Sequence, residues 1–202
     1  MAITAVVFDV GETLVDESRA WAERAVGMGV TPLTLMGALG AVIERGDDHR
    51  EVWNLLGVAR PTDPPSIETV DLYPDALPCL VAIRAAGLTV GIAGNQPAGA
   101  EQQLLAVGFE PDFIASSASW GVEKPSPLFF EKVVAAAGCA AEQILYVGDR
   151  LDNDVLPARA SGMRTAFIRR GPWGFIHAQL PTAALADYRI DSLTELLETI
   201  AH

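Results

Sequence analysis

Short hydrophobic runs alternate with helix-period segments along most of the chain. The runs are rich in β-branched and aromatic residues, as buried strands are, and they occupy residues 4–9, 88–93, 113–115, 144–147, 165–168 and 187–190. The segments between them repeat apolar residues with the period of a helix and occupy residues 75–86, 98–107, 127–137, 153–161 and 192–201. Strands that alternate with helices build a parallel sheet covered on both faces. The pattern therefore predicts an α/β fold with a doubly wound parallel sheet.

Residues 15–73 interrupt this alternation. They contain helical patterns but no convincing strand, and the patterns span residues 17–28, 33–45 and 48–56, followed by a proline-rich link at 60–66. An insertion between the first strand and the next helix can arch over the carboxyl ends of the strands. We therefore expect two domains, an α/β core from residues 1–14 and 74–202 and a small helical insertion from residues 15–73.

The composition is that of a folded globular chain with an acidic surface. Half of the 202 residues are hydrophobic, and 14 basic against 26 acidic residues give a formal net charge of -12. Such a charge disfavours non-specific binding to nucleic acid or to an anionic membrane. No apolar run approaches the length of a membrane span, and the N-terminal apolar stretch lacks a charged leader. We expect a soluble cytoplasmic protein; the composition leaves its oligomeric state open.

The cysteines and histidines do not form a recognisable metal-binding or disulfide pattern. Cys79 and Cys139 lack CxxC spacing, and the three histidines are scattered, without the i, i+4 pairing of a helical zinc site. These spacings disfavour zinc chemistry, a Ser-His hydrolase and a disulfide framework.

Carboxylates follow two of the predicted strands. Asp9 ends the first strand, and Asp149 and Asp154 follow the fourth, within "VGDRLDND". The carboxyl ends of the strands form the ligand crevice of an open α/β sheet, so these three side chains should lie close together. Neighbouring carboxylates repel one another unless a cation lies between them. Oxygen ligands without histidine or cysteine favour Mg²⁺.

Lys124 is one of only two lysines in the chain. It lies in "GVEKPSPLFF", just before a predicted helix, whereas twelve of the other thirteen basic residues are arginines. Because this chain mostly uses arginine for exposed positive charge, a lysine at this position favours a specific role. Its compact ammonium suits a place between a phosphate and a nucleophilic carboxylate.

Four of these segments together resemble the motifs of the haloacid dehalogenase-like hydrolase superfamily, and the resemblance covers nearly the whole chain. The first is "FDVGETL", with Asp9 at the position of the nucleophile, and the second is "GIAGN". The third is "GVEKPSP" with Lys124, and the fourth is "YVGDRLDND", with Asp149 and Asp154 at the metal positions. The resemblance implies a Rossmann-like core, a small helical cap over residues 15–73 and an aspartyl intermediate. For most members it also implies Mg²⁺-dependent hydrolysis of phosphate esters.

Residue 11 departs from the pattern of the family's phosphatases. They carry a second aspartate two residues after the nucleophile, as general acid and base, and this chain has Gly11 there. The Gly11 carbonyl can still coordinate Mg²⁺, but proton transfer is lost, and that step is typically worth about 10²–10⁴-fold in rate. We expect slow turnover, a preference for activated esters and a phosphoenzyme that accumulates. Glu12, Asp16 and Glu17 are the candidates to replace the missing acid.

The end of the second strand is a further departure. The family usually has a serine or threonine there to hold the phosphate, whereas this chain has Gly94 followed by Asn95. We expect Asn95, backbone N–H groups around Gly94, and Lys124 to hold the phosphate oxygens.

Substrate choice should lie mainly in the helical insertion, because the rim of the sheet supplies only phosphate and metal contacts. The side chains there best able to contact the leaving group are aromatic or basic, and they are Trp21, Arg45, His49, Arg50 and Trp53. A sixth candidate, Trp173, lies in "RRGPWGFIH", which its glycines and proline predict to be a loop at the same rim. A purely structural role stays open for each of the six.

The leading hypothesis is a Mg²⁺-dependent phosphatase or phosphotransferase that acts on a small phosphorylated metabolite through an aspartyl phosphate on Asp9. One alternative is a catalytically weak relative that binds a phosphorylated ligand or a protein partner, since two motif positions are glycine. Another is a 2-haloacid dehalogenase, which uses the same aspartate without metal. Dehalogenases of that type usually carry tyrosine where Gly11 stands and lack the carboxylate of Asp149.

Overall fold

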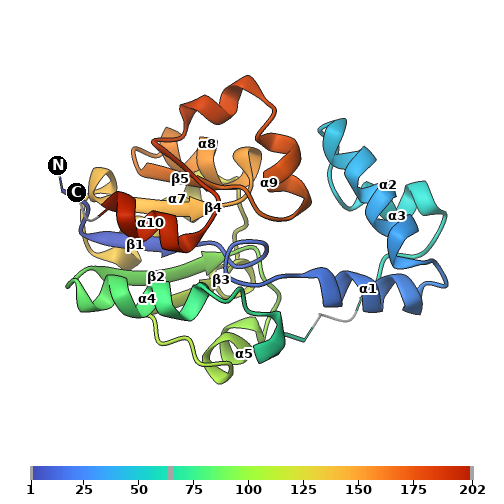
Figure 1. The fold of residues 1–202 in the computed structure, drawn as a ribbon, viewed down its shortest axis with the longest axis horizontal. Helices are drawn as coiled ribbons and strands as arrows, with labels where there is room; N and C mark the ends of the chain where they lie inside the picture. The colour runs from blue at the N-terminus through green and yellow to red at the C-terminus, as the bar shows by residue number, and fades with distance from the viewer. Residues whose placement is uncertain (1, 63–65, 201–202) are drawn as a thin grey trace.

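Six parallel strands form one sheet in the computed structural model, which describes residues 2–62 and 66–200 (Figure 1). The strands run in the order β3-β2-β1-β4-β5-β6 across the sheet. Their bounds are β1 Ala5–Phe8, β2 Thr89–Gly94, β3 Phe113–Ser116, β4 Ile144–Gly148, β5 Arg164–Ile168 and β6 Tyr188–Ile190. Each overlaps one of the hydrophobic runs, which confirms the predicted parallel α/β fold.

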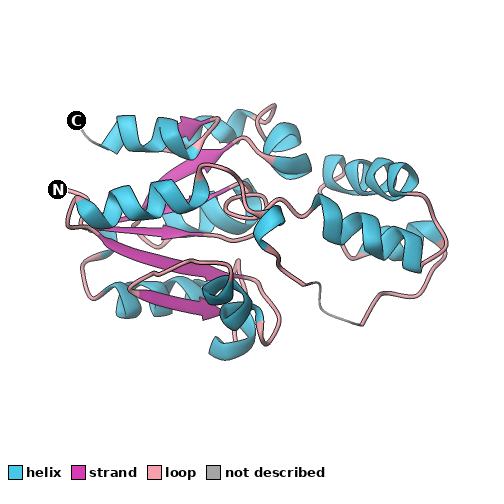
Figure 2. Cartoon of the chain, turned by 60° about the horizontal axis from the view of Figure 1, so that its bottom comes forward, coloured by secondary structure: helices cyan, strands magenta, loops and turns pink. Residues whose placement is uncertain are grey.

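Helices cover both faces of this sheet (Figure 2). The main ones are α4 Ala76–Ala85, α5 Ala100–Ala106, α7 Pro127–Ala137, α8 Leu156–Ala160 and α10 Leu193–Ile200. Successive side chains of a strand point to opposite faces, so Val6 and Phe8 of β1 pack with α4, α5 and α10, whereas Ala5 and Val7 pack with α7 and α8. The sheet is therefore buried on both sides, and only its ends are left for a site.

Three helices between β1 and α4 form an apolar cluster of their own beside the carboxyl ends of the strands (Figure 1). They are α1 Ser18–Gly27, α2 Pro32–Glu44 and α3 Glu51–Leu56. Leu35 and Leu39 of α2 pack with Trp21 of α1 and Trp53 of α3. The same cluster also includes Trp173, which follows β5. These helices of the predicted insertion thus contact the core through a tryptophan.

Residues 171–177 form a helix, so the prediction of a loop there is wrong. Helix α9, Gly171–His177, has Pro172 in its first turn and packs against α2. A proline in the first turn interrupts no helical hydrogen bond. Gly174 does not mark a turn either: a Cβ there would stand 3.0 Å from the Ile168 carbonyl oxygen, so the glycine allows close packing.

The remaining elements are short. The helix predicted at 153–161 begins with a π-helical turn, Leu151–Val155, before α8, and α6 is Ser117–Trp120. Three 3₁₀ turns span Thr69–Asp71, Ala141–Gln143 and Pro181–Leu185. Residues 63–65 of the proline-rich link and residue 201 of the last predicted helix lie outside the described residues. Within residues 2–62 and 66–200 no single helix has the length and apolarity of a membrane span, and α1 with α2 passes that test only as a pair bent by 110°.

Candidate active site

A cavity of about 770 Å³ lies between the carboxyl ends of the strands and the helical insertion. Twelve of the residues singled out from the sequence line it, and they are Asp9, Gly11, Glu12, Glu17, Trp21, His49, Arg50, Trp53, Asn95, Lys124, Asp149 and Trp173. Four others do not line it: Asp16, Arg45, Gly94 and the fully buried Asp154. Core and insertion thus contribute to the same cavity.

Asp9 and Asp149 stand side by side because they follow neighbouring strands. β1 and β4 pair in parallel with Phe8 opposite Val147, and the Asp9 N–H donates to the Val147 carbonyl oxygen at 2.9 Å. β4 ends at Gly148, so Asp149 comes next at the same edge of the sheet. The strand register therefore puts both carboxylates at one end of the cavity.

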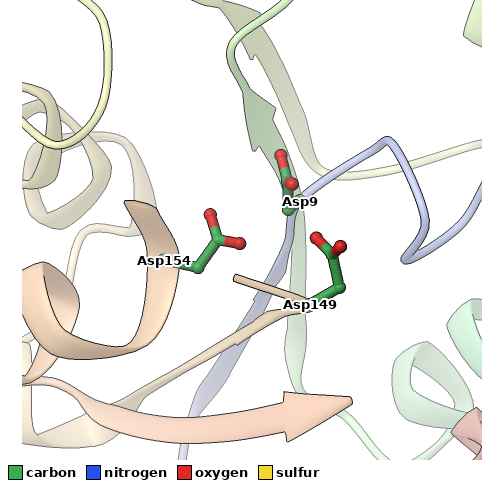
Figure 3. Close-up of side chains that lie close together, drawn as sticks. All are labelled: Asp9, Asp149 and Asp154. Atoms are coloured by element: carbon green, nitrogen blue, oxygen red, sulfur yellow. The ribbon is translucent and has the colours of Figure 1, made fainter. Parts of the chain in front are cut away.

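Asp154 completes a cluster of three buried carboxylates (Figure 3). It belongs to the π-helical turn after β4, and one oxygen from each of Asp9, Asp149 and Asp154 lies within 4.8 Å of the others. Gly148 makes room for this turn, since a Cβ there would stand 2.5 Å from the Asp154 carboxyl carbon. The structure thus brings together the three carboxylates expected from the sequence.

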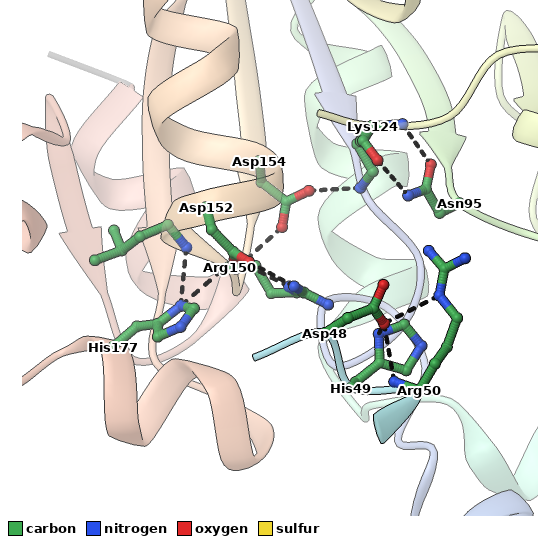
Figure 4. Close-up of polar contacts among 10 residues, drawn as sticks. Asp48, His49, Arg50, Asn95, Lys124, Arg150, Asp152, Asp154 and His177 are labelled. Carbon is green, nitrogen blue, oxygen red and sulfur yellow. Dashed lines mark hydrogen bonds and ion pairs between the residues drawn. The ribbon is translucent and has the colours of Figure 1, made fainter. Parts of the chain in front are cut away.

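Lys124 is paired with this cluster (Figure 4). Its buried Nζ lies 2.7 Å from Oδ1 of Asp9 and 2.5 Å from Oδ1 of Asp154. The Asn95 side chain holds the lysine backbone, because its Oδ1 accepts from the Lys124 N–H at 2.7 Å and its Nδ2 donates to the Lys124 carbonyl at 2.9 Å. Burial opposes the charge, but Asp154 and Asp9 outweigh it and raise the pKa of Lys124 well above its usual value.

The charge and the ligand atoms of the cluster fit a divalent cation. When all three carboxyl groups are ionised, one ammonium leaves two negative charges to be balanced. Oδ2 of Asp149 is buried and has no hydrogen-bond partner among the described residues. Burial, with Asp154 and Asp9 nearby, raises the pKa of Asp149 well above its usual value. An orphaned carboxylate oxygen beside two other carboxylates suits a hard cation such as Mg²⁺.

Gly94 packs against the Asp9 carboxylate and is not one of the residues that line the cavity. A Cβ on Gly94 would stand 2.5 Å from Oδ1 of Asp9, so a serine or threonine there would displace that carboxylate. Asn95 does line the cavity, but both polar groups of its side chain are engaged by the Lys124 backbone. While those bonds hold, Asn95 positions Lys124, and its amide is not available to a phosphate.

The space beside Gly11 is filled by the carboxyl group of Glu17. A Cβ on residue 11 would stand 2.8 Å from both Cδ and Oε1 of Glu17. Trp21 Nε1 donates to Oε2 of Glu17 at 3.3 Å, and burial with the nearby Glu12 carboxylate raises the pKa of Glu17 to about 7. Glu12 itself accepts from the Tyr73 hydroxyl at 2.6 Å and from the Glu17 N–H at 3.0 Å. Glu12 thus accepts hydrogen bonds at both carboxylate oxygens, whereas Glu17 accepts one from Trp21 at Oε2.

The aromatic candidates both pack and line the cavity. Trp21 and Trp53 stack with ring centroids 6.0 Å apart and an interplanar angle of 17°. Cζ of Arg150 lies 4.8 Å from the centroid of the Trp173 ring, and His49 meets the same ring edge-on at 5.9 Å. Burial and nearby arginines lower the pKa of His49 to about 4, so its imidazole is neutral at pH 7.

The arginines on the cavity wall are only partly those expected, since Arg50 lines the cavity and Arg45 does not. Arg45 follows α2, more than half of its side chain is exposed, and it pairs with Asp47 at 3.2 Å outside the cavity. Sequence reasoning missed Arg24, Arg60 and Arg150, which line the cavity. Arg150 could have been found from its place inside the fourth motif. Arg24 and Arg60 carry no local signal, because only the packing of the insertion brings them there.

Comparison with known proteins identifies the family. Residues 3–162 match the haloacid dehalogenase-like hydrolases. A glyceraldehyde 3-phosphate phosphatase of Methanopyrus kandleri is 30% identical over 98% of this chain and 97% of its own, and a phosphoglycolate phosphatase of Cereibacter sphaeroides is 32% identical over 87% and 79%. The L-2-haloacid dehalogenase structure from Xanthobacter autotrophicus shares the fold with a TM-score of 0.70 at 19% identity, over 99% of both chains. The chain therefore belongs to the haloacid dehalogenase-like hydrolases.

Proposed function

We propose that this hydrolase is a Mg²⁺-dependent phosphatase that cleaves small phosphorylated metabolites through an aspartyl phosphate on Asp9. The observation that carries the proposal is the ion pair of Asp9 and Lys124 in the cavity, beside two further carboxylates. Phosphoryl transfer relies mainly on positioning and charge stabilisation. A carboxylate nucleophile held by an ammonium, next to ligands for a divalent cation, meets both needs.

Each residue has a distinct task in this proposal. An Asp9 carboxylate oxygen attacks phosphorus while the ester oxygen leaves, and the Lys124 ammonium offsets negative charge on the phosphoryl oxygens. Asp9, the Gly11 carbonyl, Asp149 and Asp154 would hold Mg²⁺, which supplies further charge neutralisation when bound. Water then hydrolyses the aspartyl phosphate and regenerates Asp9.

The substrate we propose is a small phosphorylated compound with a second polar or anionic group. Related proteins are named as phosphatases of glyceraldehyde 3-phosphate, phosphoglycolate and phosphoserine. Although the chain is acidic, its cavity is lined by the arginines Arg24, Arg50, Arg60 and Arg150. Guanidinium groups bind carboxylates well. We assign this selection mainly to residues 15–73, as a cap domain over a core of residues 1–14 and 74–202, to which Arg150 belongs.

With Mg²⁺, the purified protein is expected to hydrolyse p-nitrophenyl phosphate and at least one of a panel of small phosphorylated metabolites, and EDTA should abolish this activity. Release of inorganic phosphate is the measurement. Release of chloride from 2-chloropropionate without metal would instead identify a dehalogenase. No turnover, with a melting temperature raised by a phosphorylated ligand, would identify a binding protein. Either result would overturn the phosphatase proposal.

Arg50→Ala is expected to change the order of kcat/KM across the panel, whereas Arg45→Ala should leave it unchanged. Both arginines belong to the insertion and have exposed side chains, 40% and 54% respectively, but only Arg50 lines the cavity. A hydrogen bond to a charged group is typically worth about 1.5–3 kcal/mol, so substrates with a carboxylate should lose about 10-fold or more. Identical orders in the two variants would remove Arg50 from the substrate site.

A further inference from the structure

A carboxyl group stands where residue 11 has no side chain. Cδ and Oε1 of Glu17 are both 2.8 Å from the ideal position of a Cβ on Gly11, and Oε2 is 3.2 Å from it. An alanine would already force Glu17 to move. The glycine therefore leaves room for a carboxyl group that comes from a different part of the chain, and both residues line the cavity that contains Asp9.

The chain between these two residues folds back to bring Glu17 to this place. Gly11 and Val15 form a parallel β-bridge, and the Glu12 N–H donates to the Val15 carbonyl oxygen at 2.7 Å. The Glu17 N–H donates to Oε1 of Glu12 at 3.0 Å, which fixes the backbone at the start of α1. Trp21 Nε1, one turn into α1, donates to Oε2 of Glu17 at 3.3 Å. Both the backbone and the side chain of Glu17 are thus held.

The other oxygen of Glu17 is left for a ligand. Oε1 accepts no hydrogen bond from the described residues, and the residue borders the cavity. A carboxyl group with one oxygen anchored and the other without a hydrogen bond, in a residue that borders the cavity, has the arrangement of a proton donor or acceptor for a bound molecule.

The other two candidate acids, Glu12 and Asp16, do not share this arrangement. Both oxygens of Glu12 already accept hydrogen bonds, from the Tyr73 hydroxyl and the Glu17 N–H. Asp16 accepts from the Ser18 N–H at 2.8 Å and does not line the cavity. Of the three acids that the sequence offers as replacements, Glu17 is the one at the place of the missing side chain.

We propose that Glu17 is the general acid and base of the reaction; this inference rests on the proposed phosphatase function. As Asp9 attacks phosphorus and the phosphorus–ester oxygen bond breaks, protonated Glu17 gives its proton to the leaving oxygen. The resulting Glu17 carboxylate then takes a proton from water, whose oxygen attacks the aspartyl phosphate. The Asp9 oxygen–phosphorus bond breaks, inorganic phosphate leaves, and both carboxyl groups return to their starting forms.

Glu17→Gln, which keeps the shape of the side chain, tests the proposal. With Mg²⁺ its kcat for ethyl phosphate should fall by about 10²–10⁴-fold. The loss should be smaller for p-nitrophenyl phosphate, whose leaving group needs no proton. During turnover of labelled p-nitrophenyl phosphate, rapid acid quench should recover more labelled protein than with the wild type, because hydrolysis of the aspartyl phosphate lacks its base. Asp16→Asn, the matched control, should behave as wild type.

A reciprocal exchange keeps the test decisive if Glu17→Gln folds poorly. Gly11→Asp alone should bring no gain, because its side chain meets Glu17. Gly11→Asp combined with Glu17→Ala should recover at least about 10-fold over Glu17→Ala in hydrolysis of ethyl phosphate. If Glu17→Gln stays within threefold of an active wild type on both esters, the inference is wrong and the phosphatase stands. If the wild type itself neither hydrolyses esters nor becomes labelled, the proposed function has failed.

Discussion

Asp9→Asn is expected to abolish phosphate ester hydrolysis, with a loss of about 10³-fold or more, because an amide cannot serve as the nucleophile. No labelled protein should be recovered after rapid acid quench with labelled substrate and Mg²⁺. In the wild type the label should survive acid and be released by hydroxylamine, as an acyl phosphate is. Initial rates of phosphate release and the amount of protein-bound label are the two measurements.

The variant should fold, which makes the result interpretable. Asp9 is one of three buried carboxylates whose negative charges repel one another, and Lys124 keeps its contact with Asp154 at 2.5 Å when the Asp9 charge is removed. The melting temperature of Asp9→Asn should therefore be at least that of the wild type without Mg²⁺. Full activity in a folded Asp9→Asn protein would exclude the covalent route and favour the binding function.

The place of the site could be predicted from where the hydrophobic runs end. Asp9 and Asp149 directly follow the strands β1 and β4, and parallel neighbours bring their carboxyl ends to one edge. Residue identity also singled out Lys124, since lysine is rare in this chain, and its ammonium lies beside Asp9. These inferences need only the period of the pattern, the order of the elements and the residue types. They are therefore insensitive to the exact packing.

Contacts that depend on packing could not be predicted in this way. The proline and glycines of residues 171–177 carry turn signals, but packing against α2 makes the segment helical. Gly94 was expected to help hold a phosphate, which stays a prediction, and its close approach to Oδ1 of Asp9 was not foreseen. The sequence offers Glu17 as one of three candidate acids. Only the structure shows that the backbone turn after Gly11 brings the Glu17 carboxyl group beside that glycine. In each case the position of the residue depends on how segments pack together, which the pattern of residue types does not encode.

Lys124→Met is expected to lower the free energy of unfolding by about 3–5 kcal/mol in Mg²⁺-free buffer, because removing one partner leaves buried charges uncompensated. The Lys124 ammonium lies 2.7 Å from Asp9 and 2.5 Å from Asp154, and its side chain is 1% exposed. Urea denaturation with a chelator present is the measurement. Lys132→Met, which removes the chain's other lysine from the exposed face of α7, should change the free energy by less than about 0.5 kcal/mol.

Adding Asp154→Asn to Lys124→Met separates the charge from the packing. The double variant buries one carboxylate charge fewer, so its loss should be smaller than the sum of the two single losses by about 0.5–3 kcal/mol. Mg²⁺ at about 100 times its Kd should add about 2.7 kcal/mol to the stability of any variant that still binds it. Additive losses, or a Lys124→Met protein as stable as Lys132→Met, would show that the ammonium does not compensate the buried charges of Asp9 and Asp154.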